Sequence, residues 1–186
     1  MKGESHHIHK HLVEQCQTND ASAQEELYKL YAGAMYNICR RMMNGEDEAK
    51  DLLQESFVDA FRKLPSLRET STFPLWLKRI VTNNCINAIR KKKLDTVTMG
   101  DEWDAVDDVA PDLDYTNYQA GQVMIAVDKL PNGCKTVLNL YLFEGYDHKE
   151  IGGILGITES ASKAQYSKAK ARIRNYLELN HQQHVR

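Results

Sequence analysis

Apolar residues return at steps of three and four positions through most of the chain, and this period restricts the fold more than any other feature. An α-helix has about 3.6 residues per turn, so such residues share one face of it. Nowhere does the chain show the sustained alternation of a strand. We therefore predict an all-α protein. The first clear run consists of Leu27, Leu30, Tyr31, Ala34, Ile38 and Met42.

Turn and cap residues divide this pattern into helices in the first half of the chain. Asp20 can cap the first run, and Asn44-Gly45 ends it. A second helix is expected from about residue 47 until Pro65 stops it. Thr72 is expected to cap a third helix, which tolerates Pro74 in its first turn.

The period breaks off after residue 93 and returns near residue 115. Residues 94–114 are acidic and lack a period, which predicts a flexible linker. Helices are then expected at about 115–130, 134–143, 148–155 and 159–179, the third opened by a capping box at Asp147–Glu150. We predict two small helical domains joined by an acidic linker: an N-terminal extension (1–18), a first domain (19–93), the linker (94–114) and a second domain (115–186).

Charge is distributed unevenly along the chain, although the net charge is only −2. Residues 95–128 hold nine acids and no Lys or Arg. Residues 78–93 hold six bases and no acid, and residues 159–174 hold five bases and one acid. Two basic segments indicate a polyanionic partner such as nucleic acid.

The remaining composition argues for a reduced compartment and against catalysis. The four cysteines are scattered, which predicts buried thiols. No apolar run approaches about 18 residues and the start MKGESHHIHKH lacks a signal peptide, so we expect no membrane span and a cytoplasmic protein. His6, His7, His9 and His11 lie in a segment expected to be flexible and without other ligands, so we expect no metal site. No nucleophile–base pair or phosphate-binding loop is present, and no cofactor or catalytic residue is expected.

The segment EIGGILGITESASKAQYSKAKARI (150–173) has the spacing of a helix-turn-helix, whose second helix can enter the major groove. A helical wheel separates an apolar side from a side of cations and hydroxyls, which suits phosphate and base-edge contacts. The alternative is a helical hairpin with a solvated basic face. The polar side holds Ser160, Lys163, Ser167, Lys170 and Arg174.

Two other helices each carry a polar face opposite their core. In the helix from residue 47, Asp51, Gln54, Glu55 and Val58 form a stripe that either docks a protein or is simply solvated. In the helix from residue 73, an aromatic ring, amides and cations share one side, as on surfaces that stack unpaired bases. Alternatively, the tryptophan packs on a neighbouring helix. That side holds Trp76, Arg79, Asn83, Asn87 and Arg90.

Three segments in series resemble the extracytoplasmic-function (ECF) sigma factors, which retain only sigma regions 2 and 4. They are DLLQESFVDAFRKL, STFPLWLKRIVTNNCINAIRKKK and LPNGCKTVLNLYLFEGYDHKEIGGILGITESASKAQYSKAKARI. The resemblance implies that region 2 docks on the clamp coiled coil of the largest RNA polymerase subunit through Asp51, Gln54 and Glu55. It also implies that region 2 opens the promoter −10 element and captures a flipped base, with Asn83 at the matching position and the loop 68–73 beside it.

By the same resemblance, region 4 reads the duplex −35 element, with Lys163, Ser167 and Lys168 at matching positions and Ser160 and Lys170 on the same face. Ser162, Ala164 and Gln165 depart from the usual residues, so we expect looser packing of the recognition helix. The implied partners are core RNA polymerase, promoter DNA (single-stranded −10, duplex −35) and an anti-sigma factor.

The acidic linker is either an RNA mimic in the polymerase or a solvated spacer. Two alternatives to a sigma factor stand: a helix-turn-helix regulator that acts without polymerase, and a His-rich metal-dependent enzyme.

Overall fold

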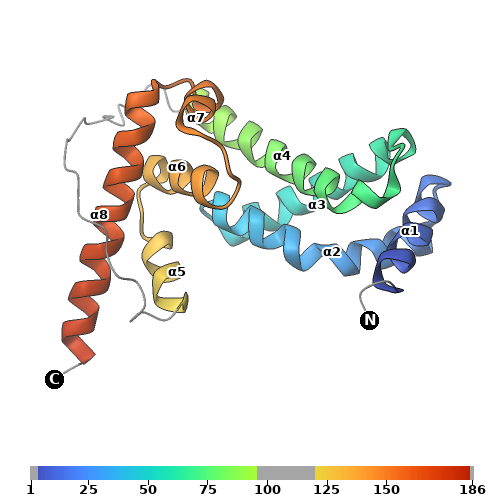
Figure 1. Ribbon diagram of the computed structural model, residues 1–186, viewed down its shortest axis with the longest axis horizontal. Coiled ribbons are helices and arrows are strands. Elements are labelled where there is room, and N and C mark those ends of the chain that lie inside the picture. Colours follow the sequence, from blue (N-terminus) through green and yellow to red (C-terminus); the bar gives the residue numbers. More distant parts are fainter. Residues whose placement is uncertain (1–3, 96–119, 185–186) are drawn as a thin grey trace. The chain divides into compact units, whose positions relative to one another are not determined.

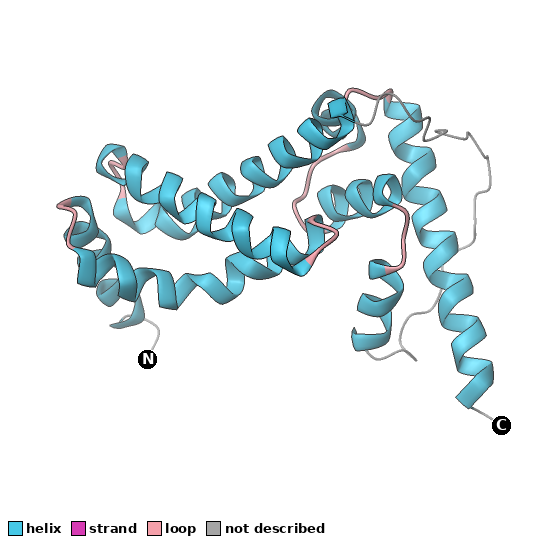
Figure 2. Ribbon diagram, turned by 180° about the vertical axis from the view of Figure 1, so that it is seen from behind, coloured by secondary structure: helices cyan, strands magenta, loops and turns pink. Residues whose placement is uncertain are grey.

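The computed structural model of the protein describes residues 4–95 and 120–184, and every regular element in these ranges is a helix (Figure 1). Colouring by secondary structure shows no strand in the described ranges (Figure 2). The chain divides into two compact units, residues 1–94 and 95–186, which are described separately. The prediction of an all-α fold with two helical domains is confirmed.

The first unit contains four α-helices and two short 3₁₀ turns. They are α1 (Glu4–Gln17), α2 (Ala21–Met42), α3 (Glu46–Lys63), η1 (Leu64–Ser66), η2 (Thr70–Thr72) and α4 (Phe73–Asp95). The Asp20 carboxylate caps α2 by accepting a hydrogen bond from the Ala23 amide at 3.0 Å. Pro65 falls within η1, directly after α3, as expected for a residue that cannot continue a helix. The Thr72 hydroxyl donates to the Glu69 carbonyl at 2.7 Å, immediately before α4 begins.

The core of the first unit follows the helical period, although Leu30 and Ala34 of the run on α2 are exposed. Along α3 and into η1, one stripe of residues at helical spacing is buried, and Leu52 and Ser56 add a second buried row beside it. On α4, Leu77, Val81 and Cys85 are fully buried. The stripe consists of Ala49, Leu53, Phe57, Ala60 and Leu64.

The N-terminal segment is helical, so the expectation of a flexible segment was wrong. In α1, Leu12, Val13 and Cys16 are buried, a short apolar face of one turn. The Gln17 amide then donates to the carbonyls of Leu64 at 3.2 Å and Leu67 at 2.8 Å. Helix α1 therefore packs on the rest of the first unit, and Gln17 joins it by hydrogen bonds to the segment after α3. His11 is exposed, and the side chains of His6, His7 and His9 lie outside the described ones.

All four cysteines are buried thiols outside any disulfide, as predicted. Burial, together with the charges of Asp20 and Glu26, raises the pKa of Cys16 to about 11. The Sγ atoms of Cys39 and Cys85 lie 4.0 Å apart and bring α2 against α4.

The described part of the second unit consists of α5 (Ala120–Asp128), α6 (Asn132–Leu142), α7 (His148–Leu155) and α8 (Glu159–His184). The helix expected from residue 115 is described only from Ala120, and residues 96–114 of the predicted linker lie outside the described ranges. Among the described helices, none combines the length and apolarity needed to cross a membrane.

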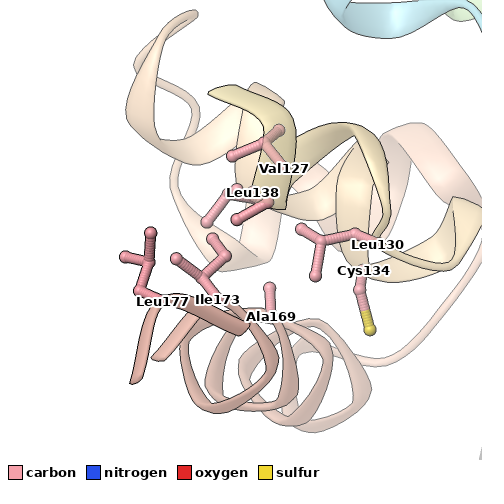
Figure 3. Packing of buried hydrophobic residues seen from close by; sticks show 8 residues of the cluster. Val127, Leu130, Cys134, Leu138, Ala169, Ile173 and Leu177 are labelled. Atoms are coloured by element: carbon pink, nitrogen blue, oxygen red, sulfur yellow. The ribbon is translucent and has the colours of Figure 1, made fainter. Parts of the chain in front are cut away.

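One apolar cluster joins α5, α6 and α8 (Figure 3). The residues that α8 contributes to the cluster lie on the side of that helix that the helical wheel predicts to be apolar. Beside the cluster, the ammonium of Lys135 is buried and pairs with Asp128 at 2.8 Å, which closes the turn between α5 and α6. The cluster consists of Ala126, Val127, Leu130, Cys134, Leu138, Ala169, Ile173 and Leu177.

The turn between α7 and α8 depends on two glycines. Gly156 ends α7 with φ of 63°, in the left-handed region that favours glycine. A Cβ on Gly152 would lie 2.9 Å from the Ile157 carbonyl oxygen, whereas a Cβ on Gly153 would meet nothing within 4 Å. The predicted capping box is present: the Asp147 carboxylate accepts from the Glu150 amide at 2.7 Å, and Glu150 accepts from the Asp147 amide at 2.8 Å.

We expect Gly152→Ala to lower the free energy of unfolding of the second unit by about 1–3 kcal/mol, because the added methyl group displaces a backbone carbonyl. Gly153→Ala is the matched control in the same helix, and we expect it to be neutral or stabilising by about 0.5–1 kcal/mol. Hydrogen exchange of amides in α7 and α8 measures both effects. Equal effects of the two substitutions would contradict the close approach.

Candidate nucleic-acid and protein interfaces

The stripe on α3 is exposed, on the side opposite the core. Asp51, Gln54 and Glu55 are exposed, and Val58 is 55% exposed. Gln54 and Glu55 each lie three or four residues from both Asp51 and Val58, so the four side chains form one continuous surface on the helix. The surface combines two carboxylates, an amide and an aliphatic group.

Side-chain contacts join α3 to α4. The Asn84 amide donates to the Ser56 hydroxyl and to the Asp59 carboxylate, both at 3.2 Å. Near the end of α4, Lys92 forms an ion pair with Glu48 at 2.6 Å. Helical spacing along α4 did not reveal these partners of Asn84. The contacts hold the outward faces of α3 and α4 in a fixed relation within the first unit.

The polar face of α4 is open along its length. Arg79, Asn83, Asn87 and Arg90 are exposed, and Trp76 is partly exposed. The Trp76 ring lies 5.9 Å from the ring of Phe73, at an angle of 39°. Phe73 is itself buried, with its ring edge-on to Tyr31 at 5.3 Å. The tryptophan therefore rests on a fixed aromatic residue and keeps part of its surface accessible.

Helix α1 packs against the loop that precedes α4. Helix α1 packs against η1 and η2, and the two hydrogen bonds of Gln17 hold the carbonyls at the start of the loop. Within the loop, the Glu69 carboxylate accepts a hydrogen bond from the Ser71 amide at 3.3 Å, and the bond to Ser71 lowers the pKa of Glu69. Arg68 is exposed. The support from α1 was not foreseen, although the spacing of Leu12 and Cys16 was the signal for it.

The polar face of α8 is most open at its start. Ser160 and Lys163 are exposed, whereas Ser167, Lys168 and Lys170 are half-buried. Lys163 pairs with Glu159 at 2.6 Å, and this contact lowers the pKa of Glu159. The ammonium of Lys170 lies 5.2 Å from the centre of the Tyr166 ring. The wheel placed Arg174 on the same face, but its Nε atom is buried without a hydrogen-bond partner.

Two of the three unusual residues of α8, Ser162 and Gln165, make side-chain hydrogen bonds, where we had expected looser packing. Ser162 is fully buried, and its hydroxyl lies 3.0 Å from Nδ1 of His148. Gln165 accepts from the thiol of Cys134 at 2.9 Å. Burial, and secondarily the charge of Lys163, lowers the pKa of His148, so the imidazole is neutral at neutral pH. Polar side-chain contacts therefore join α8 to α7 and to α6 at these positions.

Comparison with known proteins identifies the family. Residues 27–94 match Sigma-70 region 2, and residues 121–173 match Sigma-70, region 4. The ECF RNA polymerase sigma factor SigW of Bacillus subtilis is 30% identical over 183 residues, which cover 90% of this chain and 96% of SigW. The chain belongs to the ECF sigma factors.

Two further proteins are similar to this chain. The ECF sigma factor SigE of Mycolicibacterium smegmatis is 28% identical over 157 residues, and the matched region spans 82% of this sigma factor but only 61% of SigE. The solved structure of CnrH in complex with the cytosolic domain of CnrY matches with 20% identity and a TM-score of 0.48, over 92% of this chain and 97% of that one. Helix α1 of this sigma factor precedes both matched regions.

Proposed function

We propose that this sigma factor binds core RNA polymerase, directs it to promoters by reading −10 and −35 elements, and nucleates promoter melting. The observation that carries the proposal is the open face of α4, where a partly exposed tryptophan lies among exposed amides and cations. On this proposal the protein is a specificity subunit without catalysis of its own, and it acts in the cytoplasm. Its partners are core polymerase, promoter DNA and, by family resemblance, an anti-sigma factor.

The experiment that tests this function mixes the full chain with core polymerase and selects promoters from a DNA library by run-off transcription. We expect a stable complex and a set of transcripts whose templates share −10 and −35 elements. A helix-turn-helix regulator that acts without polymerase would form no such complex. Such a regulator would not need the exposed stripe on α3 for a polymerase contact. We therefore favour the sigma factor over this alternative.

The α3 stripe is proposed to be the polymerase contact. Acids and an amide around an exposed valine suit a protein surface that carries cations around an apolar centre. The Asn84 side chain joins α3 to α4. Binding of the α3 stripe to the polymerase would therefore also fix the position of the α4 face that is proposed to melt DNA.

We expect Glu55→Lys to weaken core binding by about tenfold or more, because it inverts a charge at the contact. Glu26→Lys makes the same charge reversal on the exposed side of α2 and serves as the control. Titration of fluorescent sigma factor with core polymerase measures both affinities. Equal affinities for the two variants would count against the docking assignment.

The α4 face is proposed to hold the unpaired −10 strand. Extruding a base costs a few kcal/mol, and stacking on an aromatic ring returns about 1–3 kcal/mol per base. The accessible part of Trp76 can supply that stacking, Asn83 and Asn87 can bond base edges, and Arg79 and Arg90 can neutralise phosphates. Binding energy alone would drive melting, and the loop 68–73 would enclose the flipped base.

We expect Asn83→Ala to reduce open-complex formation by about tenfold while −35 binding stays within about twofold, because only the melted state uses the amide. Asn37→Ala removes an exposed amide from α2 and should change neither property. Permanganate footprinting of unpaired thymines reports melting, and gel shift of the holoenzyme on a duplex reports binding. A parallel loss in both assays would contradict the assignment.

The α8 face is proposed to lie in the major groove of the −35 element, where Ser160, Lys163, Ser167, Lys168 and Lys170 contact phosphates and base edges. Lys163 is the most open cation of this set. Its ion pair with Glu159 is a surface contact, so a phosphate can compete for the ammonium.

We expect Lys163→Ala to lower promoter affinity and to reduce the salt slope of binding by about one, because one phosphate contact is lost. Lys29→Ala is a matched control: Lys29 also forms an exposed i,i+4 pair, with Glu25, on α2. Holoenzyme binding measured across a salt series separates the two variants. An unchanged slope for Lys163→Ala would mean that this lysine contacts no phosphate.

The acidic linker is proposed to follow a positively charged RNA path in the polymerase. Eight acids without a base between residues 94 and 114 support this, since such a segment carries the charge of a short RNA.

A further inference from the structure

The buried contact between the two helices of the helix-turn-helix is a hydrogen bond. Ser162 lies in the first turn of α8 and is fully buried. Its hydroxyl lies 3.0 Å from Nδ1 of His148, the first residue of α7. In the middle of α7, a Cβ on Gly152 would lie 2.9 Å from the Ile157 carbonyl oxygen in the turn and 3.5 Å from the amide nitrogen of Glu159, where α8 begins. The first half of α7 therefore lies close both to the turn and to the start of α8.

The imidazole of His148 is held in one orientation by aromatic rings from two other helices. The Tyr141 ring of α6 stacks on it at 4.5 Å, with an angle of 11° between the planes. The Tyr166 ring of α8 lies 5.6 Å away at 60°, and the two tyrosine rings are 4.7 Å apart. The capping box of Asp147 fixes the backbone beside the histidine. Packing thus directs Nδ1 towards the serine.

Burial of the His148 ring favours its neutral form. Burial and the ammonium of Lys163 lower the pKa of His148, whereas Glu159 and Asp147 oppose this shift more weakly. A neutral imidazole has one donor and one acceptor nitrogen, and a serine hydroxyl can both donate and accept. The bond can therefore form with either tautomer of the ring.

We propose that His148 is a positioning residue, which sets the placement of the recognition helix on the −35 duplex through its bond to Ser162. The inference rests on the proposed role of the α8 face. Ser160 and Lys163 flank Ser162, so displacement of Ser162 moves both DNA-facing side chains. Base-edge contacts require placement within about 0.5 Å, which a directional bond supplies better than an apolar contact of the same size.

The decisive variant is the double substitution His148→Phe with Ser162→Val. Phenylalanine keeps a ring against Tyr141, and valine fills the buried site of Ser162 without leaving an unpaired hydroxyl. Replacing both partners by apolar groups is often neutral for stability, so the variant should fold. We expect the holoenzyme with this variant to lose about tenfold in discrimination between a selected promoter and the same duplex with a scrambled −35 element.

Two further variants separate the bond from the stacked ring. His148→Asn keeps a hydrogen-bonding atom near the position of Nδ1 but loses the ring, and we expect discrimination within about threefold of the unchanged protein. His11→Phe makes the same exchange of side chains at an exposed histidine of α1 and should have no effect. If the double variant unfolds, Ser162→Thr, which keeps the hydroxyl, is compared with Ser162→Val.

Thermal unfolding of each full-length variant is measured beside holoenzyme binding. A folded double variant with undiminished discrimination would overturn the inference, since the pair would then only fill space; discrimination kept by Ser162→Val as well as by Ser162→Thr would do the same. If the unchanged protein fails to distinguish the two duplexes, the −35 assignment falls and this inference with it. If the unchanged protein distinguishes them and the double variant does so equally, only the inference falls.

Discussion

Burial of one side of α4 determines where its other side points. Leu77, Val81 and Cys85 are fully enclosed, and Cys85 meets Cys39 of α2 at 4.0 Å between the sulfur atoms. Rotation of the helix would expose these apolar side chains to water and bury cations. Each change would raise the free energy of the folded state. The opposite face, from Trp76 to Arg90, is therefore held outward by the core, and a rigid surface loses less entropy when it binds a flexible single strand.

Helix α1 extends this rigidity to the loop beside the face. It packs on the loop and contributes the two hydrogen bonds of Gln17, although its own apolar face spans only one turn. A loop without such support would sample many conformations, and a base pocket formed from it would have to be ordered during each binding event. The short helix thus contributes to the candidate site without touching the proposed ligand.

Sequence patterns predicted the fold well wherever the determinant was local. The caps at Asp20 and Asp147 and the buried stripe of α3 depend on neighbours within one or two turns, so spacing alone revealed them. Contacts between elements were not predictable in this way. The partners of Asn84 lie 25 and 28 residues away, and that of Ser162 lies 14 residues away across a turn. Helix α1 was missed because three apolar residues among histidines make a weak periodic signal.

The candidate −35 face places a carboxylate beside a cation. Lys163 pairs with Glu159 at 2.6 Å. A phosphate must displace the acid before it gains the lysine, and the displaced acid then repels the backbone. This competition reduces the sequence-independent part of DNA binding, which depends mainly on such cations, and leaves base contacts unaffected. Lower background affinity raises the ratio of specific to non-specific binding, which is the quantity that matters for a protein that must select promoters among many competing sites.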